Sequence, residues 1–372
     1  MAGLEIPVEL GAEFIHGEAE ATRALLRQAG IAAIESTREQ RYLENGKLKR
    51  GSAFAEAQRA VQHAPRLERD VSFRAFLGHR RLPRKTKALA EMMVQGFDAA
   101  DPARVSARSI VEEWGEGGSL GASQPRPEGG YGALFDWLAE SVLAAGACLK
   151  LDSPVCTINW KRGTVLAQGT SFGQPFTVKA RQAIITLPLG VLQSRAVRFT
   201  PSLEQKRTAL QQLASGPVIR VAMRFHSRFW EARAPQIAFF HVPQAPFPTF
   251  WTPLPMRAAL LTAWAGGPKA ARLTGSSKEK LVSTALRAVG MVFGDEPRKQ
   301  LAAAFVQDWH ADPYSLGGYS YLRVGGTGAR ERLAEPLEDT LFFAGEATDA
   351  DEAGTVAGAL RSGQRAAREV RQ

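Results

Sequence analysis

Residues 341–370 read LFFAGEATDADEAGTVAGALRSGQRAAREV, and this stretch predicts how the rest of the chain is organised. Residues 341–343 are a short apolar run typical of a strand, and Gly345 then removes side-chain bulk where another group can approach the backbone. A helix with apolar residues at helical spacing is expected to begin near Thr355. The unpaired N–H groups of its first turn, around Thr355 and Val356, suit an anion or an electron-rich carbonyl edge. The stretch therefore predicts a ligand cradle, the alternative being a strand and helix that only complete a sheet.

The motifs AGE (344–346), TV (355–356) and GALRSG (358–363) resemble the C-terminal flavin-binding motif of the FAD-dependent amine oxidases. That family contains the monoamine oxidases, the polyamine oxidases and the lysine-specific histone demethylases. The resemblance implies that Gly345 and Glu346 bind FAD, with Glu346 on the ribityl chain, and that the helix start faces flavin N1 and the C2 carbonyl. Donors there stabilise the negative charge of the reduced ring. The loop before Thr355 has no cysteine, which implies non-covalent FAD.

The N-terminal segment LEIPVELGAEFIHG (4–17) resembles the GA-x-W-x-HG stretch of the family, and it is most similar to that of polyamine and spermine oxidases. The resemblance implies that Ala12, Glu13 and Phe14 lie beside the cofactor and that His16 faces the substrate. A single histidine is more often a hydrogen-bonded structural residue, and that interpretation of His16 stays open.

Two strand-like segments carry further candidates. Val155, in SPVCTI, falls where the backbone of a family valine holds the adenine, although an ordinary core valine would look the same. Arg220, in the alternating segment GPVIRVAMRF (216–225), stands where the family keeps a lysine that holds a water against flavin N5. Arginine stays protonated, whereas a buried lysine can exchange a proton. Arg220 could position a water or an anion, or it could share a polar strand face with Arg224.

The segment DWHADPYSLGGYSYLRVG (308–325) resembles the family pattern W-x-x-DP-x-x-x-G-x-YSY. The resemblance implies that Trp309, Tyr319 and Tyr321 help to wall the amine pocket, although aromatics at such spacing are usually core residues. The Pro- and Phe-rich residues 229–264 suggest edge strands over a substrate cavity.

One family feature is missing. FAD proteins of this family open with a strand, a G-x-G-x-x-G turn and a helix, and no such motif precedes residue 4. Neither GEGGSLG (115–121) nor GGTG (325–328) is expected to follow a strand and open a helix. We therefore expect a Rossmann-like FAD-binding domain that is N-terminally incomplete, and FAD binding that is weak without the missing βαβ unit.

Composition narrows the choice of protein class. The 372 residues are 45% hydrophobic, contain no run of eighteen apolar residues, and begin without the pattern of a signal peptide, which predicts a soluble, cytoplasmic protein. The net charge is +10, but the basic run HRRLPRKTK (79–87) is explained by a solvated loop, so nucleic acid is an improbable partner. Cys148 and Cys156 have no metal-ligand spacing and are expected to be core thiols. A cationic amine would need local acidic groups that outweigh the global charge.

The expected fold class is mixed α/β, an FAD-binding domain of amine oxidase type with a second domain of mixed sheet and helices. The FAD-binding domain is expected to comprise 1–35, 130–200 and 325–372, and the substrate domain 36–129 and 201–324. Sequence patterns predict an Asn-Gly hairpin turn at 45–46. They predict helices at 22–30, 86–99, 106–114, 129–146, 202–213 and 277–289, strands at 31–35, 148–151, 154–160, 164–168, 176–180, 183–186 and 216–225, and a loop at 118–129.

The resemblance spans nearly the whole chain and implies oxidation of a monoamine- or polyamine-like substrate. Hydride passes from the carbon beside a neutral amine to flavin N5, and the imine hydrolyses to an aldehyde while oxygen yields hydrogen peroxide. Two alternatives stay open. The first is a non-catalytic protein that keeps the fold but binds FAD poorly, and the second is a related flavin-dependent desaturase. The sequence does not determine which amine is used, the oligomeric state or the electron acceptor.

Overall fold

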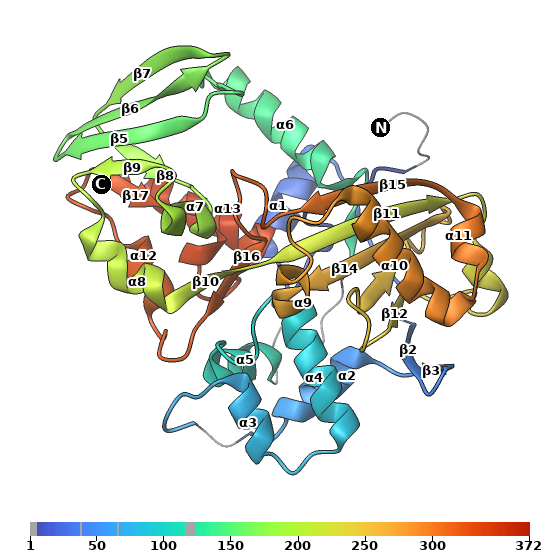
Figure 1. The fold of residues 1–372 in the computed structure, drawn as a ribbon. Coiled ribbons are helices and arrows are strands. Elements are labelled where there is room, and N and C mark those ends of the chain that lie inside the picture. The colour runs from blue at the N-terminus through green and yellow to red at the C-terminus, as the bar shows by residue number, and fades with distance from the viewer. Residues whose placement is uncertain (1–5, 38, 65–66, 116–123) are drawn as a thin grey trace.

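A computed structural model describes residues 6–37, 39–64, 67–115 and 124–372 of the chain (Figure 1). The described α-helices are α1 (Glu20–Ala29), α2 (Ala53–Val61), α3 (Phe73–His79), α4 (Arg84–Gly96), α5 (Ala107–Trp114), α6 (Gly130–Ala144), α7 (Leu189–Ser194), α8 (Arg207–Gln212), α9 (Gly267–Ala271), α10 (Lys278–Phe293), α11 (Glu296–Gln300), α12 (Ala329–Ala334) and α13 (Val356–Glu369). Short 3-10 turns are η2 (Glu204–Lys206), η3 (Phe229–Ala232) and η4 (Glu346–Thr348).

The described strands form several sheets. They are β1 (Ala33–Ile34), β2 (Gln40–Glu44), β3 (Lys47–Arg50), β4 (Arg126–Pro127), β5 (Val155–Lys161), β6 (Thr164–Ser171), β7 (Gln174–Ala180), β8 (Ala183–Ile185), β9 (Arg198–Thr200), β10 (Leu213–Gly216), β11 (Val218–Phe225), β12 (Phe239–His241), β13 (Thr249–Trp251), β14 (Leu260–Gly266), β15 (Leu301–Asp308), β16 (Tyr319–Leu322) and β17 (Leu341–Phe343). The mixture of helices and sheets confirms the expected α/β class.

The largest sheet has seven strands in the order β15-β11-β14-β13-β12-β2-β3. Val218–Phe225 (β11) lies between two antiparallel neighbours, so both of its edges are hydrogen-bonded. All but one of its residues are buried. One face carries Ile219, Val221 and Met223 into the core that α10 closes. Arg220 and Arg224 lie on the same face of β11, as that alternative supposed, but Arg220 is only 1% exposed and does not face solvent.

The aromatic segment 229–264 was expected to supply edge strands, and this expectation is wrong. Its strands β12, β13 and β14 lie inside the seven-stranded sheet, and β15 and β3 form the edges. The Asn-Gly turn is confirmed, because Asn45 and Gly46 both have positive φ and join β2 to β3.

Helices α2 to α5 pack together beside this sheet (Figure 1). Their shared core contains Phe73, Met93 and Trp114, all at most 4% exposed. Ser106 begins α5 by accepting a hydrogen bond from the Ser109 N–H, which is the cap expected at a helix start. This layer fixes the position of the α4 C-terminus and of α5 against the sheet.

A second group of elements contains the four-stranded sheet β7-β6-β5-β9 and the parallel pair β17-β8, on which α13 packs (Figure 1). Two expectations here are wrong. Residues 148–151 form no strand, and Cys148 and Cys156 are exposed rather than core thiols. Cys148 lies in the loop after α6, and Cys156 is the second residue of β5.

The strands of each sheet can be compared with the residue ranges expected for the two domains. Every strand of the seven-stranded sheet comes from 36–129 or 201–324, and β5 to β9 with β17 come from 130–200 and 325–372. The division into domains stays a prediction.

The motif GGTG (325–328) was not expected to follow a strand and open a helix, and that expectation is wrong. The motif is a loop, but it lies between β16 and α12. The GEGGSLG motif lies almost entirely outside the described residues, as does the first half of the loop expected at 118–129. In the described second half that expectation is wrong, because Arg126 and Pro127 form the short strand β4, which pairs with β1.

Candidate active site

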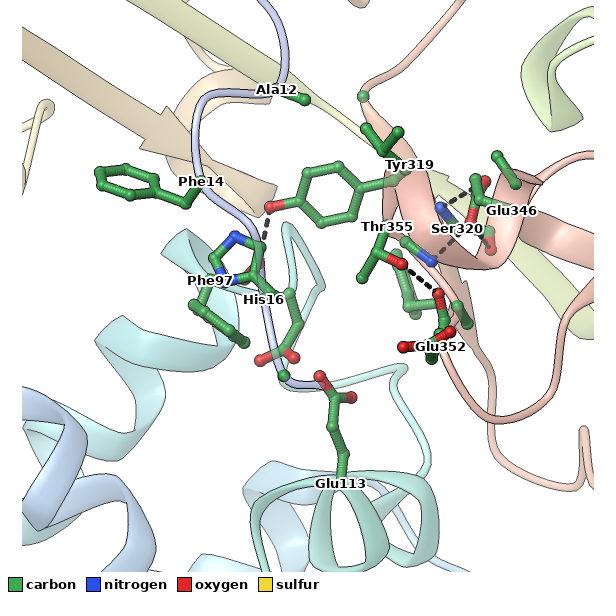
Figure 2. A pocket seen from close by; sticks show the side chains of 18 of the residues that line it. Ala12, Phe14, His16, Phe97, Glu113, Tyr319, Ser320, Glu346, Glu352 and Thr355 are labelled. Atoms are coloured by element: carbon green, nitrogen blue, oxygen red, sulfur yellow. Dashed lines mark hydrogen bonds between the residues drawn. The ribbon is translucent and has the colours of Figure 1, made fainter. Parts of the chain in front are cut away.

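A cavity of about 1580 Å³ lies where the two groups of elements meet. Its walls come from the N-terminal segment, α4 and α5, strands of the seven-stranded sheet, β16 and the start of α13. Figure 2 shows Ala12, Phe14 and His16 on one segment, with Tyr319 and Thr355 on one side of it and the Phe14 ring pointing to the other. Ligand pockets usually measure roughly 300–1,000 Å³. This cavity therefore has room for a large cofactor and a substrate together.

The start of α13 forms one end of the cavity. Thr355 caps the helix by accepting a hydrogen bond from the Gly358 N–H at 3.0 Å, and its hydroxyl donates to the Glu352 carbonyl at 2.6 Å. A Cβ on Gly358 would lie 2.2 Å from that carbonyl, so only glycine lets the acidic loop pack onto the helix. Thr355 and Val356 line the cavity, and the free N–H groups of the first turn give this end a partial positive charge.

Glu346 lies beside the helix start, after β17. Its carboxylate accepts hydrogen bonds from the Ser320 hydroxyl at 2.7 Å, the Ser320 N–H at 3.1 Å and the Gly354 N–H at 2.9 Å. Arg330, which is 6% exposed, also donates to Ser320. These contacts hold the carboxylate of Glu346 at the cavity wall (Figure 2).

Aromatic rings form the wall that faces the seven-stranded sheet. Phe14 contacts Phe239 and Trp251 with ring centroids 5.6 and 5.8 Å apart, and Trp264 packs on Trp251 at 5.7 Å. The Trp309 indole donates to the Leu10 carbonyl at 2.8 Å and so fixes the N-terminal segment across the cavity. This wall excludes water from one side of the site.

Tyr319 and His16 face each other across the cavity (Figure 2). The Tyr319 hydroxyl donates to the Phe97 carbonyl at 2.6 Å, and the Phe97 ring packs edge-on against His16 at 5.3 Å. Burial lowers the pKa of His16 to about 4, so the ring is neutral near pH 7, and Nδ1 has no hydrogen-bond partner among the described residues. Burial and nearby carboxylates raise the pKa of Tyr319 well above its usual value.

A buried ion-pair network lies under the aromatic wall. Glu13 forms a salt bridge with Arg220 through one oxygen and with Arg126 through the other, the latter at 2.7 Å. The Trp251 indole N–H also donates to Glu13 at 2.9 Å. Burial alone would raise the pKa of Glu13, but the charges of Arg220 and Arg126 outweigh it and lower the pKa. Arg220 also donates to the Gly11 carbonyl at 3.1 Å, which fixes the guanidinium to the N-terminal segment.

The charge of the cavity is opposite to that of the chain. Nine carboxylate residues and three arginines line it, although the whole chain carries +10. The two lining histidines, His16 and His241, add no charge near pH 7 because burial lowers both pKa values to about 4. The local acidic surplus that a cationic amine would need is therefore present.

The structure brings most of the sequence-predicted residues together. The following residues line the cavity: Ala12, Glu13, Phe14, His16, Arg220, Trp309, Tyr319, Tyr321, Glu346, Thr355 and Val356. Val155 and Gly345 do not. The Val155 side chain packs against the core between β5 and β8, and Gly345 donates its N–H to the Ser362 hydroxyl at 2.8 Å.

Sequence reasoning missed several residues of the site. Trp251 and His241 come from strands within a segment that the pattern located but did not orient, so no sequence signal assigned them to the cavity. Arg126 lies on β4, in a stretch that was expected to be a loop, and it was missed as a partner of Glu13. Asp98 and Glu113 were also missed. The signal that could have found them is their place at the end of one helix and on the next, in the layer beside the sheet.

Comparison with known proteins agrees with this arrangement. Residues 3–371 match the family described as flavin containing amine oxidoreductase, and the chain belongs to that family. The cofactor of the family is FAD, and its members are oxidoreductases that act on amines. Among the described residues, no helix is long and apolar enough to cross a membrane.

Two curated relatives illustrate the family. The chain is 32% identical over 251 residues to lysine-specific histone demethylase 2 of Homo sapiens, a match covering 65% of this chain and 29% of that protein. It is 32% identical over 258 residues to polyamine oxidase 4 of Oryza sativa subsp. japonica, covering 66% and 50%. The chain thus spans less than a third of the demethylase and half of the polyamine oxidase.

Solved structures share the fold. Wild-type putrescine oxidase bound to putrescine superposes with a TM-score of 0.79 at 21% identity, covering 98% of this chain and 88% of that chain. Cyclohexylamine oxidase from Brevibacterium oxydans gives a TM-score of 0.77 at 18% identity. The expected amine oxidase fold is confirmed.

The described residues fit the flavin end of FAD. The α13 N–H groups suit an electron-rich ring edge, and the aromatic wall suits an apolar ring. The chain contains no G-x-G-x-x-G, so the turn that usually holds the pyrophosphate has no counterpart in these 372 residues.

Proposed function

We propose that this chain forms the active site of an FAD-dependent oxidation of a monoamine- or polyamine-like substrate. The observation that carries the proposal is the single cavity that joins the α13 start, an aromatic wall and an acidic surplus. When bound, FAD supplies the hydride acceptor for the carbon next to the amine nitrogen. The product is an imine, which water converts to an aldehyde, and oxygen is reduced to hydrogen peroxide.

The residues of the chain have distinct roles in this proposal. Thr355 and Val356 orient the α13 N–H groups toward the flavin, and Glu346 holds the cofactor side of the wall. Trp309, Tyr319 and Tyr321 bound the substrate side and exclude water. A dry site favours the neutral amine, whose lone pair stabilises the developing cation. His16 is neutral near pH 7 and can accept a hydrogen bond from the substrate nitrogen.

Arg220 stands where the resemblance places a lysine. Its salt bridge with Glu13 holds the guanidinium in place, so in this proposal it positions a water or a carbonyl edge. Val155 and Gly345 lie outside the cavity lining. On the resemblance alone, the backbone of Val155 is assigned to the adenine and Gly345 to FAD binding.

The test is reconstitution of the purified chain with FAD. We expect weak retention of FAD by these residues alone and firmer retention when a βαβ unit with G-x-G-x-x-G is fused before them. In the fused protein, oxidised-flavin absorbance should bleach on anaerobic addition of an amine, and a peroxidase-coupled assay should detect peroxide. Failure of every tested monoamine and polyamine to bleach the bound flavin would overturn the proposal.

A second candidate is a non-catalytic member of the fold. The buried Arg220–Glu13 pair, where the resemblance places a lysine, favours it. A protein that stays colourless after reconstitution with FAD, in the fused form as well, would support this candidate over the oxidase.

A further inference from the structure

Most of the net positive charge of the chain comes from two short segments. Residues 39–50 and 79–87 contain nine Lys and Arg residues and only two Glu residues, which gives them a net charge of +7. The whole chain carries +10, so all the other residues together carry only +3. Charge concentrated in this way is the electrostatic signature of a surface that binds a polyanion, provided that the fold brings the two segments together.

The structure places the two segments side by side. Residues 39–50 contain the hairpin of β2 and β3, and residues 79–87 run from the end of α3 into the first turn of α4 (Figure 1). Lys85 of α4 donates a hydrogen bond to the Tyr42 hydroxyl of β2, and its ammonium lies 4.3 Å from the centroid of the Tyr42 ring. Tyr42 pairs directly with Lys49 of β3, so the Lys49 side chain points to the face of the hairpin that α4 contacts.

The run 79–87 alone was explained by a solvated loop, and the hairpin adds a second basic segment to it. Together they form a basic surface of five exposed side chains, which are Lys47, Lys49, Arg81, Arg84 and Lys85. Arg81 and Arg84 have neither a hydrogen bond nor an ion pair with any described residue. Arg84 and Lys85 also begin α4, where the helix dipole makes cations unfavourable. A bound anion would offset both the mutual repulsion of these cations and their repulsion by the helix start.

The composition of the basic surface indicates which polyanion fits it. None of the large hydrophobic side chains that are exposed among the described residues lies in either segment, so the surface offers nothing to insert into a membrane or to form the apolar centre of a protein interface. Single-stranded nucleic acid is bound largely by stacking on aromatic rings. The aromatic ring of this surface, that of Tyr42, is only 7% exposed and is covered by Lys85. Cations without an accessible ring or apolar side chain suit the phosphates of a duplex.

We propose that this basic surface binds the phosphate backbone of double-stranded nucleic acid without reading its sequence. The inference goes beyond the proposed function and does not depend on it, because the surface lies outside the cavity lining. Lys49 is paired with Glu44, which leaves four cations to contact phosphates. Four such contacts give a slope of about −3.6 for the logarithm of affinity against the logarithm of salt concentration, or a loss of affinity of roughly 150-fold between 50 and 200 mM salt.

Binding is measured on the purified chain, without cofactor, by the fluorescence anisotropy of a fluorescein-labelled DNA duplex of about twenty base pairs. We expect a dissociation constant between roughly 10⁻⁶ and 10⁻⁴ M near physiological salt, and the salt dependence given above. Two duplexes of unrelated sequence should bind equally within about twofold, because phosphate contacts carry no sequence information.

Variants assign the binding to the basic surface. The double variant Arg81→Gln with Arg84→Gln should bind the duplex at least about tenfold more weakly at 50 mM salt, and its salt slope should be shallower by about 2. The matched control is Lys179→Gln with Arg181→Gln, which removes the same charge from exposed side chains at the end of β7 and just after it. The control should change the affinity by less than about twofold. Circular dichroism checks the folding of both variants, neither of which loses a side-chain contact with a described residue.

Four outcomes would overturn the inference. An anisotropy that does not change at 50 mM salt would show that the surface is only solvated. Equal weakening in the two double variants would assign the binding to the net charge of the chain rather than to this surface. Tighter binding to vesicles that contain phosphatidylserine would assign the surface to a membrane, and tighter binding to the single strand than to the duplex would contradict the choice of nucleic acid. None of these outcomes bears on the oxidase proposal, which is tested by the bleaching of bound flavin.

Discussion

The Glu13 network allows the sharpest prediction. Glu13→Gln keeps the size of the side chain and its hydrogen-bonding capacity but removes the only negative charge that bridges Arg126 and Arg220 among the described residues. The two arginine side chains are 6% and 2% exposed, so water cannot replace the lost charge. Breaking a buried pair in this way costs about 3–5 kcal/mol.

Urea unfolding measures this cost directly from the midpoint and slope. Thermal unfolding gives a second estimate, since for 372 residues each kcal/mol corresponds to about 1.3 °C, and the expected loss in Tm is about 4–6 °C. The control is Glu91→Gln. It breaks the surface pair with Arg74, whose side chains are 34% and 55% exposed, and it should cost less than about 1 kcal/mol.

A double variant tests the physical reason. Glu13→Gln with Arg220→Met removes both charges, so it should lose less stability than the sum of the two single variants. Equal costs for Glu13→Gln and Glu91→Gln, or strict additivity in the double variant, would refute the idea that charge pairing holds the N-terminal segment under the cavity.

Other predictions concern the two ends of the cavity. Gly358→Ala should destabilise the protein, because its Cβ would lie 2.2 Å from the Glu352 carbonyl, whereas Gly363→Ala in the same helix meets nothing within 4 Å and should stabilise by up to about 1 kcal/mol in thermal unfolding. Thr355→Ala removes the cap of α13 and should cost about 1 kcal/mol in urea unfolding, and an unchanged midpoint would contradict the capping role. His241 has its pKa lowered to about 4 by burial, so it binds a proton in the unfolded chain before it does in the folded one. Its contribution to stability is therefore present above about pH 6.5 and is lost as the pH falls toward 4, by up to about 3 kcal/mol. His241→Asn should flatten the fall in urea midpoint over that range, and an unchanged slope would show that the histidine does not titrate there.

The sequence predicted the local elements where periodicity or turn chemistry was strong. The Asn-Gly hairpin, α10 and the strand–helix pair at the C-terminus follow from short-range rules. The cavity residues found in advance came from four spaced motifs rather than from periodicity. A motif indicates which side chains matter but not which residues they contact. The Glu13 network could not be predicted, because its partner Arg126 is 113 residues away in the chain.

Predictions from the sequence were wrong where the environment of a residue depends on how distant segments pack together. The segment around Phe239 and Trp251 is Pro-rich and looked like an edge, yet pairing with β2 and β14 makes it internal. Cys148 and Cys156 were expected to be core thiols because free cysteine is usually buried, but both are exposed, one in a loop and the other on β5. Asp98 and Glu113 meet only because α4 and α5 turn toward the same space.

The contrast between a basic exterior and an acidic cavity has a kinetic consequence. A positively charged ligand diffusing in from solution is first repelled by the surface and then attracted at the mouth. Dissolved salt screens exposed charges much more than enclosed ones. Raising the ionic strength should therefore speed the capture of a cationic amine, the reverse of the slowing seen when an oppositely charged surface steers its ligand.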